Sequence, residues 1–291
     1  YRMENTRDIA WASSKSFIWD AASGTVDGRN ILYSSIYPVE SSGQEAWGRS
    51  TEYTKWSIEY YSDKWYPYPW NSAVNVAGVV GGMEYPGVSF CSWKAEGAGL
   101  MGVTDHEFGH NWFPMIVASN ERLHMWMDEG LNTFIGHYSM SEFNDGEYGP
   151  WMPQTRSIVS YLTKPNRQAA MTLPDNVLSE NRSQAFYYLP SVALRLLREE
   201  VLGEQRFDEA FKTYIRRWAY KHPSPWDFFN TMEDVAGADL DWFWRSWFIE
   251  AWELDQAVDS VSYVEGTPKE GAVVHISNNK NMVMPVDLKV I

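Results

Sequence analysis

The chain has 291 residues, of which 44% are hydrophobic, and a formal net charge of −14. This length suits one large domain or two smaller ones, and the hydrophobic fraction is ordinary for a globular protein. The negative charge argues against nucleic acid or an anionic membrane as a partner, because both carry negative charge themselves.

Three further features limit the class of protein. The single cysteine, Cys91, excludes an internal disulfide and a cysteine-based zinc site, and we expect it to be a small buried residue. No run of about 18 or more apolar residues occurs, so the sequence predicts no membrane span. The chain begins at Tyr1 and not at Met, so we expect it to start inside a longer protein, and its compartment is left open.

The first third of the chain predicts strands around one helix. Residues 1–38 have an extended pattern that Pro38 ends, and residues 51–65 place aromatic side chains at helical spacing. Residues 71–92 are rich in Val and Gly and predict two adjacent strands. Residues 95–102 are rich in Gly and Ala and predict a mobile segment.

The chain is then predicted to be mainly helical. A helix that starts near Val103 or Thr104 should end or kink before Pro114, which has no N–H to donate. Short Val-rich runs after Trp252 predict β-strands. Apolar periodicity predicts further helices over residues 125–140, 184–202, 207–220, 226–236 and 239–248, and short helical pieces over 154–162.

One stretch has the pattern of a metal site: His106-Glu107-Phe108-Gly109-His110. Histidines four positions apart lie on one face of a helix, so both imidazoles can reach one metal ion. Glu107 lies beside them and can act on a metal-bound water. The alternative is a surface helix with two solvated histidines.

A zinc site needs more than two histidines. Glu129 follows His110 after 18 intervening residues, and we expect it to be the third ligand. Its helix can pack against the first one with Glu129 facing the metal. Three protein ligands leave a fourth position open for water or substrate, which distinguishes a catalytic zinc site from a structural one.

A second motif, Gly81-Gly82-Met83-Glu84-Tyr85, lies upstream. Its glycines remove side chains where the backbone can approach a ligand. Glu84 is a lone carboxylate in an apolar strand. Taken alone, it is best interpreted as an exposed residue of a turn.

In this order, the two motifs and Tyr187-Tyr188-Leu189-Pro190 resemble the M1 family of zinc metallopeptidases, the family of aminopeptidase N and leukotriene A4 hydrolase. The resemblance covers nearly the whole chain. It extends to Asn111-Trp112-Phe113 and to Trp126-Met127-Asp128-Glu129-Gly130.

The resemblance implies an α+β fold with a thermolysin-like catalytic domain over residues 39–250. This domain would be a small mixed sheet followed by a mostly helical lobe. Residues 1–38 resemble the end of an N-terminal β-domain, and residues 251–291 the start of a C-terminal β-domain.

The resemblance also implies a role for each site residue. His106, His110 and Glu129 match the ligands of one zinc ion, and Glu107 matches the general base. Tyr187 matches the tyrosine that stabilises the tetrahedral intermediate. Glu84 matches the glutamate that binds the free α-amino group of a peptide substrate, and its motif supplies further substrate-binding residues: Gly81, Gly82, Met83 and Tyr85.

Two positions depart from the family pattern. Tyr85 replaces a usual Asn, which is expected to reshape the first substrate pocket. Leu189 replaces a frequent Lys, so the choice of Tyr187 over Tyr188 rests on the spacing to Pro190 alone.

The predicted function is a zinc-dependent aminopeptidase that acts on peptides with a free N-terminus. A zinc endopeptidase and an epoxide hydrolase on the same scaffold stay open as alternatives. A non-catalytic peptide-binding module is a further alternative, which zinc content and hydrolysis of an aminoacyl reporter would separate from the enzymes. The sequence leaves the side-chain preference and the oligomeric state open.

Overall fold

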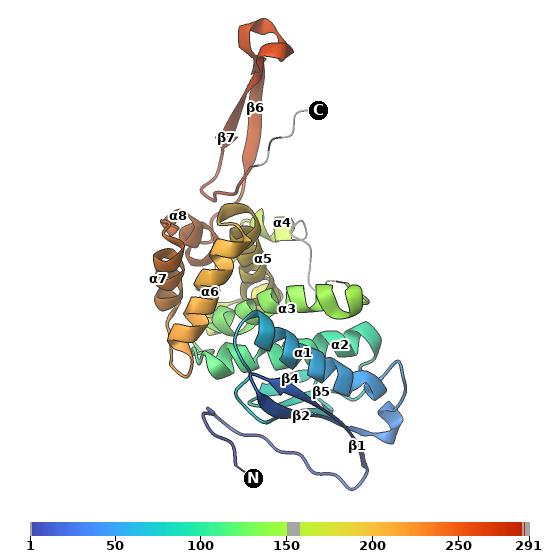
Figure 1. Ribbon diagram of the computed structural model, residues 1–291. Helices are drawn as coiled ribbons and strands as arrows, with labels where there is room; N and C mark the ends of the chain where they lie inside the picture. The colour runs from blue at the N-terminus through green and yellow to red at the C-terminus, as the bar shows by residue number, and fades with distance from the viewer. Residues whose placement is uncertain (1, 150–157, 287, 289–291) are drawn as a thin grey trace.

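A five-stranded sheet lies at one end of the molecule and a lobe of helices lies next to it (Figure 1). The structure, a computed structural model, describes residues 2–149, 158–286 and 288. A two-stranded hairpin projects from the far side of the helical lobe (Figure 1). The predicted α+β class, a small mixed sheet followed by a mostly helical lobe, is confirmed.

The sheet is mixed, with parallel strands at its centre. Across the sheet the order is β1-β2-β3-β5-β4. β2, β3 and β5 run parallel, and β1 and β4 are antiparallel strands at the two edges. The strands are β1 Phe17–Val26, β2 Arg29–Pro38, β3 Ser72–Gly78, β4 Gly82–Tyr85 and β5 Val88–Ser92.

Two predictions about these strands need correction. Residues 71–92 form three strands rather than two, because the chain reverses at Gly87, whose φ of 70° suits glycine, and makes β4 and β5 a hairpin. The sheet also continues across the domain boundary that was predicted after residue 38. β2 pairs with β3 from Leu32–Ser72 to Ile36–Val76, so β1 and β2 belong to the sheet that contacts the site helix.

Helices α1 (Ser50–Lys64) and α2 (Gly97–Gly109) pack against the sheet and against each other. α1 matches the predicted helix, but α2 begins earlier than predicted. Residues 97–102 of the segment predicted to be mobile form its first turn and a half. Leu100 and Met101 are fully buried there. Their burial outweighs the cost of glycine in a helix, which is about 1 kcal/mol per residue.

The helical lobe contains the remaining helices. The predicted helix over residues 184–202 is continuous from Gln184 to Val201, with α5 at its centre. Residues 154–157 of a predicted short helix lie outside the described residues, and α4 confirms the rest. The helices are α3 Leu131–Glu142, α4 Val159–Leu162, α5 Leu189–Leu196, α6 Glu204–Trp218, α7 Pro225–Ala236 and α8 Asp241–Trp244.

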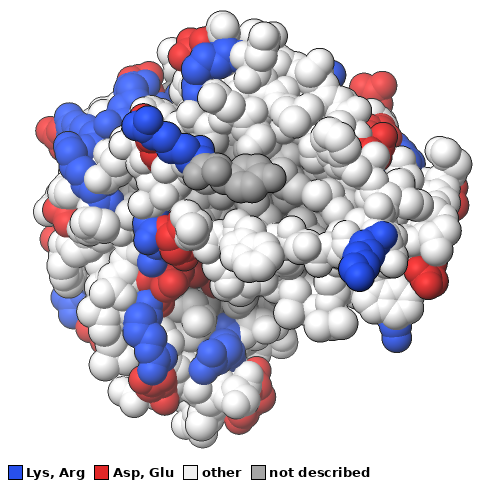
Figure 2. Space-filling model, turned by 90° about the horizontal axis from the view of Figure 1, so that it is seen from below, with Lys and Arg blue, Asp and Glu red and all other residues white. Residues whose placement is uncertain are grey.

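Strands β6 (Gln256–Tyr263) and β7 (Ala272–Asn278) form the projecting hairpin. Two of the three strands predicted after Trp252 are therefore confirmed. The third was predicted over residues 283–291: residues 283–286 and 288 form no strand, and the rest lie outside the described residues. The assignment of this part to a further β-domain stays a prediction. Over the described residues, no helix is both long and apolar enough to cross a membrane. Figure 2 shows that uncharged side chains make up most of the face seen from below, and that acidic and basic side chains are intermixed, mainly along one side of it.

Candidate active site

Helix α2 brings the two histidines of the first motif together. His106 lies in the last turn of α2. His110 is the residue directly after the end of α2, so it lies one turn beyond His106 on the same face. Their Nε2 atoms are 3.2 Å apart. The helix cannot continue past this point, because Phe113 has extended torsion angles and Pro114 lacks an N–H.

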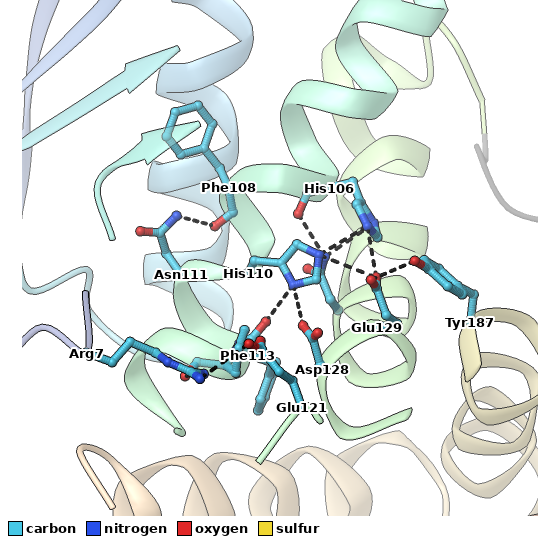
Figure 3. Close-up of polar contacts among 12 residues, drawn as sticks. Arg7, His106, Phe108, His110, Asn111, Phe113, Glu121, Asp128, Glu129 and Tyr187 are labelled. Atoms are coloured by element: carbon cyan, nitrogen blue, oxygen red, sulfur yellow. Dashed lines mark hydrogen bonds and ion pairs between the residues drawn. The ribbon is translucent and has the colours of Figure 1, made fainter. Parts of the chain in front are cut away.

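Glu129 reaches the same point from the start of the next helix. Its Oε2 lies 3.2 Å from His106 Nε2 and 3.4 Å from His110 Nε2. Figure 3 shows the three side chains pointing toward one another. The structure therefore brings together the three residues that the sequence predicts to be ligands.

These three atoms fit a zinc ion. A tetrahedron with zinc–ligand bonds of about 2.0–2.1 Å has edges of about 3.3–3.4 Å, close to the three observed separations. Glu129 Oε2 is buried and has no hydrogen-bond partner among the described residues. Two nitrogens and one carboxylate oxygen are also a donor set that zinc accepts in proteins.

Glu107 lies between α2 and the edge strand β4. It is 5% exposed, and burial raises its pKa to about 7, although His106 and His110 oppose the shift. A Cβ atom on Gly82 would overlap the Glu107 carboxylate. Glycine at position 82 therefore lets the carboxylate lie directly against the backbone of β4.

The rest of the second motif lies along β4, apart from Gly81, which directly precedes it. A carboxylate oxygen of Glu84, a ring nitrogen of His110 and an oxygen of Asp128 lie within 4.8 Å of one another. Met83 is 41% exposed, and the Tyr85 ring packs edge-on against Phe90. A Cβ atom on Gly81 would have no described neighbour within 4 Å, so of the two glycines only Gly82 has a close approach to explain it.

Tyr187 contacts the ligand cluster from the helical lobe. Its hydroxyl donates a hydrogen bond of 2.6 Å to Glu129 Oε1, and its ring stacks on His106 with centroids 6.0 Å apart (Figure 3). Burial and the neighbouring Glu129 raise the pKa of Tyr187 far above its usual range. The phenol therefore keeps its proton and can donate it in a hydrogen bond.

Gly130 explains why Tyr187 comes so close. A Cβ atom at this position would lie 2.6 Å from Pro190 Cβ and 2.9 Å from the Phe186 carbonyl oxygen. The segment that contains Tyr187 can thus pack directly on the residue after Glu129. Tyr188 packs edge-on against Tyr187, and of these two described tyrosines only Tyr187 donates a hydrogen bond to Glu129.

A match to a protein-family model identifies the family of this chain. The sequence profile of the peptidase family M1 domain matches residues 49–247, which include all these site residues. This chain belongs to peptidase family M1. The family predicted from the motifs is therefore confirmed.

Individual M1 proteins are distant relatives of this chain. It is 26% identical over 148 residues to aminopeptidase M1-C of Oryza sativa subsp. japonica, covering 49% of this chain and 16% of that protein. It is 23% identical over 151 residues to leucyl aminopeptidase of Saccharolobus solfataricus, covering 50% and 19%. The chain thus spans less than a fifth of these two relatives.

Solved M1 structures share the fold. The M1 zinc metallopeptidase from Deinococcus radiodurans matches with a TM-score of 0.62 and 18% identity, over 81% of this chain and 52% of that chain. Legionella pneumophila aminopeptidase A in complex with aspartic acid matches with a TM-score of 0.62 and 14% identity, over 90% and 35%.

The M1 site of this chain includes residues that the sequence did not point to. Asp128 Oδ1 lies 2.8 Å from His110 Nδ1, which is also 2.8 Å from the Phe113 carbonyl oxygen. Asn132 Nδ2 donates to the His106 carbonyl oxygen at 2.8 Å. Asp128 directly precedes Glu129, inside the block that carries the family resemblance, and Asn132 follows Glu129 by three positions. Neither signal assigned a role to these two residues.

Asp105 fixes α2 against its neighbours. This buried carboxylate accepts hydrogen bonds from Ser57 and Tyr61 of α1, at 2.7 and 2.6 Å, and from Ser139 of α3 at 2.7 Å. Burial raises the pKa of Asp105 to about 6, and these hydroxyl groups oppose the shift. The residue before His106 therefore links the three helices that position the ligands.

Proposed function

We propose that this chain acts as a zinc-dependent aminopeptidase, releasing the N-terminal residue of peptides. The observation that carries the proposal is the position of Glu84 two residues along β4 from Gly82, against which Glu107 lies. A carboxylate for the substrate's ammonium group is thus next to the group that would act on its first peptide bond.

One zinc ion would be held by His106, His110 and Glu129. Bound zinc supplies Lewis-acid polarisation of the scissile carbonyl and lowers the pKa of a water molecule. Glu107 accepts the proton of the attacking water and passes it to the leaving amine. Tyr187, kept neutral by its surroundings, donates a hydrogen bond to the developing oxyanion.

Glu84 would make the enzyme an exopeptidase. An ammonium group paired with a carboxylate in a partly dry site gains a charge-assisted hydrogen bond, which a blocked N-terminus cannot form. No contact among the described residues favours an epoxide substrate or an internal peptide bond. The alternatives with a different substrate are therefore less well supported.

The test is hydrolysis of aminoacyl 4-nitroanilides by the zinc-loaded chain. We expect turnover that stops when a chelator removes the metal and returns when zinc is added. N-acetylated versions of the same reporters should be poor substrates. Failure of the zinc-loaded chain to hydrolyse a panel of unblocked reporters would exclude the proposal, and equal rates on both series would favour an endopeptidase.

Replacing Glu84 by alanine should lower kcat/KM on unblocked reporters by roughly 10–100-fold, the value of about 1.5–3 kcal/mol for a hydrogen bond to a charged group. Residual hydrolysis of N-acetylated reporters should change little. The matched control is Glu180→Ala, which removes an exposed carboxylate outside the site. An equal loss on both substrate series would remove the role assigned to Glu84.

Replacing Asp128 by asparagine should weaken zinc binding by about 10–100-fold, the usual effect of losing a carboxylate that orients a metal-bound histidine. The effect should be near the lower end, because the Phe113 carbonyl oxygen still accepts from His110 Nδ1. The measurement is zinc affinity by competition with a chromophoric chelator. As a control, Asp175→Asn breaks the exposed ion pair with Arg122 and should leave the affinity unchanged. Unaltered zinc affinity in Asp128→Asn would contradict the orienting role.

A further inference from the structure

A surface pocket of about 300 Å³ lies where the central strands of the sheet end. Pro38 is the last residue of β2, Gly78 is the last residue of β3, and Trp93 directly follows β5. Because these strands are parallel, their carboxyl ends meet at one edge of the sheet. The lining residues are Pro38, Glu40, Ala77, Gly78, Val79 and Trp93.

Hydrogen bonds fix the walls of this strand-end pocket. The Trp93 N–H donates to the Gly78 carbonyl oxygen at 2.9 Å, and Ser41 Oγ donates to the Trp93 carbonyl oxygen at 2.6 Å. Trp47 Nε1 donates to the Ser92 carbonyl oxygen at 3.2 Å. The backbone around the pocket is therefore held in place before any ligand arrives.

The pocket presents apolar surface to solvent. Val79 is 93% exposed and the next residue, Val80, is 43% exposed. Glu40 is the one charged residue among the six that line the pocket. Adjacent exposed apolar side chains beside a hollow are typical of a surface that binds a partner.

The orientation of the proposed substrate points to this pocket. The amino group would lie at Glu84, and the bond to be cleaved would lie at Glu107, which packs against Gly82. From its amino end to its scissile bond, the substrate peptide thus runs antiparallel to β4, from Glu84 toward Gly82. Continued in that direction, the leaving part of the peptide passes Gly81 and Val80 and reaches Val79.

We propose that the strand-end pocket binds a large apolar side chain of the peptide substrate, on the leaving-group side of the scissile bond. This inference rests on the aminopeptidase function proposed above. Val79 and Trp93 contact the apolar side chain, and Glu40 disfavours an acidic one by like-charge repulsion. The pocket therefore selects among peptides by a residue that remains in the shortened product.

The spacing of the strands and the length of an extended peptide determine which substrate residue reaches the pocket. β3 lies two strands away from the β4 edge, with β5 between them, which corresponds to about 10 Å at about 4.8 Å per strand. An extended chain advances about 3.3 Å per residue, so about three residues beyond the first are needed. The side chain that occupies the pocket belongs to the fourth residue of the substrate.

The experiment is a leucine scan of alanine pentapeptides with the zinc-loaded 291-residue chain. The measurement is kcat/KM for release of the first alanine, with leucine placed in turn at positions 2 to 5. We expect leucine at position 4 to raise kcat/KM about tenfold over pentaalanine, and aspartate there to lower it. Dipeptides and tripeptides should show no such gain.

A variant pair then tests the location of the pocket. Val79→Asp places a charge on the pocket rim at a highly exposed position, and it should reduce the leucine-to-alanine ratio at position 4 to about one. Leu173→Asp, which charges an exposed leucine of the helical lobe, should keep the tenfold ratio.

The outcomes separate this inference from the proposed function. A chain that hydrolyses aminoacyl 4-nitroanilides but shows a flat leucine scan would overturn the pocket and leave the aminopeptidase standing. A leucine preference that Val79→Asp leaves intact would place the subsite elsewhere. No hydrolysis of reporters or peptides would remove the proposed function, and the pocket assignment with it.

Discussion

Replacing Glu107 by glutamine is expected to lower kcat by about 10³-fold while zinc stays bound. General acid–base catalysis by one side chain contributes about 10²–10⁴-fold, and an amide cannot accept the proton from water. Glutamine has nearly the same shape, and Gly82 leaves the same room for it. Because Glu107 is not one of the three proposed zinc ligands, His106, His110 and Glu129, its replacement should not remove the metal.

The measurement combines kcat on a saturating aminoacyl reporter with zinc content per chain. Glu180→Gln is the control for introducing an amide at an exposed position. If Glu107→Gln kept more than about a tenth of the activity, Glu107 would not be the base. If instead the variant lost its zinc, Glu107 would have to be treated as a ligand.

The grouping of His106, His110 and Glu129 could be predicted from the sequence because its geometry is mostly local. His106 and His110 share a helix face through the helical repeat alone, whatever the helix packs against. Glu129 needed one further inference, that two consecutive helices pack together. The residues that orient the ligands depend on how that packing turns out. Asp128 and Asn132 touch opposite histidines, and no periodicity in the sequence specifies which of them faces which histidine.

The fold predictions that were wrong have a related cause. Glycine is an unfavourable helix residue in isolation, so residues 95–102, which are rich in Gly and Ala, were predicted to be mobile. In the folded chain, Leu100 and Met101 are buried, and this tertiary packing makes the segment helical. Likewise, the resemblance assigned β1 and β2 to another domain, whereas β2 also pairs with β3, which lies more than thirty residues later in the sequence. Strand pairing over such a separation is not encoded in local pattern.

The choice between Tyr187 and Tyr188 also depends on tertiary packing that the local sequence pattern does not contain. Neighbouring residues on a helix point about 100° apart, so the helix phase decides which of them faces the ligands. That phase is set by Gly130, which lets Pro190 and the Phe186 carbonyl pack against it. The spacing to Pro190 therefore had a physical basis, although the sequence did not show the contact that creates it.

Replacing Tyr187 by phenylalanine should lower kcat by about 10²–10³-fold, the usual effect of removing one oxyanion donor, with little change in KM. Binding of a phosphinic peptide, which resembles the tetrahedral intermediate, should weaken by a similar factor, because the hydroxyl acts on the transition state more than on the substrate. Tyr188→Phe is the matched control, one position away along the same helix, and should keep nearly full activity.

Zinc content has to be measured in the same Tyr187 variant. The hydroxyl also donates to Glu129 Oε1 at 2.6 Å, so its loss could act through the ligand instead of the oxyanion. A fall in kcat with full zinc occupancy and weaker phosphinate binding identifies the oxyanion role. A fall that added zinc restores would mean that Tyr187 serves to hold Glu129. A larger loss in Tyr188→Phe than in Tyr187→Phe would reverse the assignment.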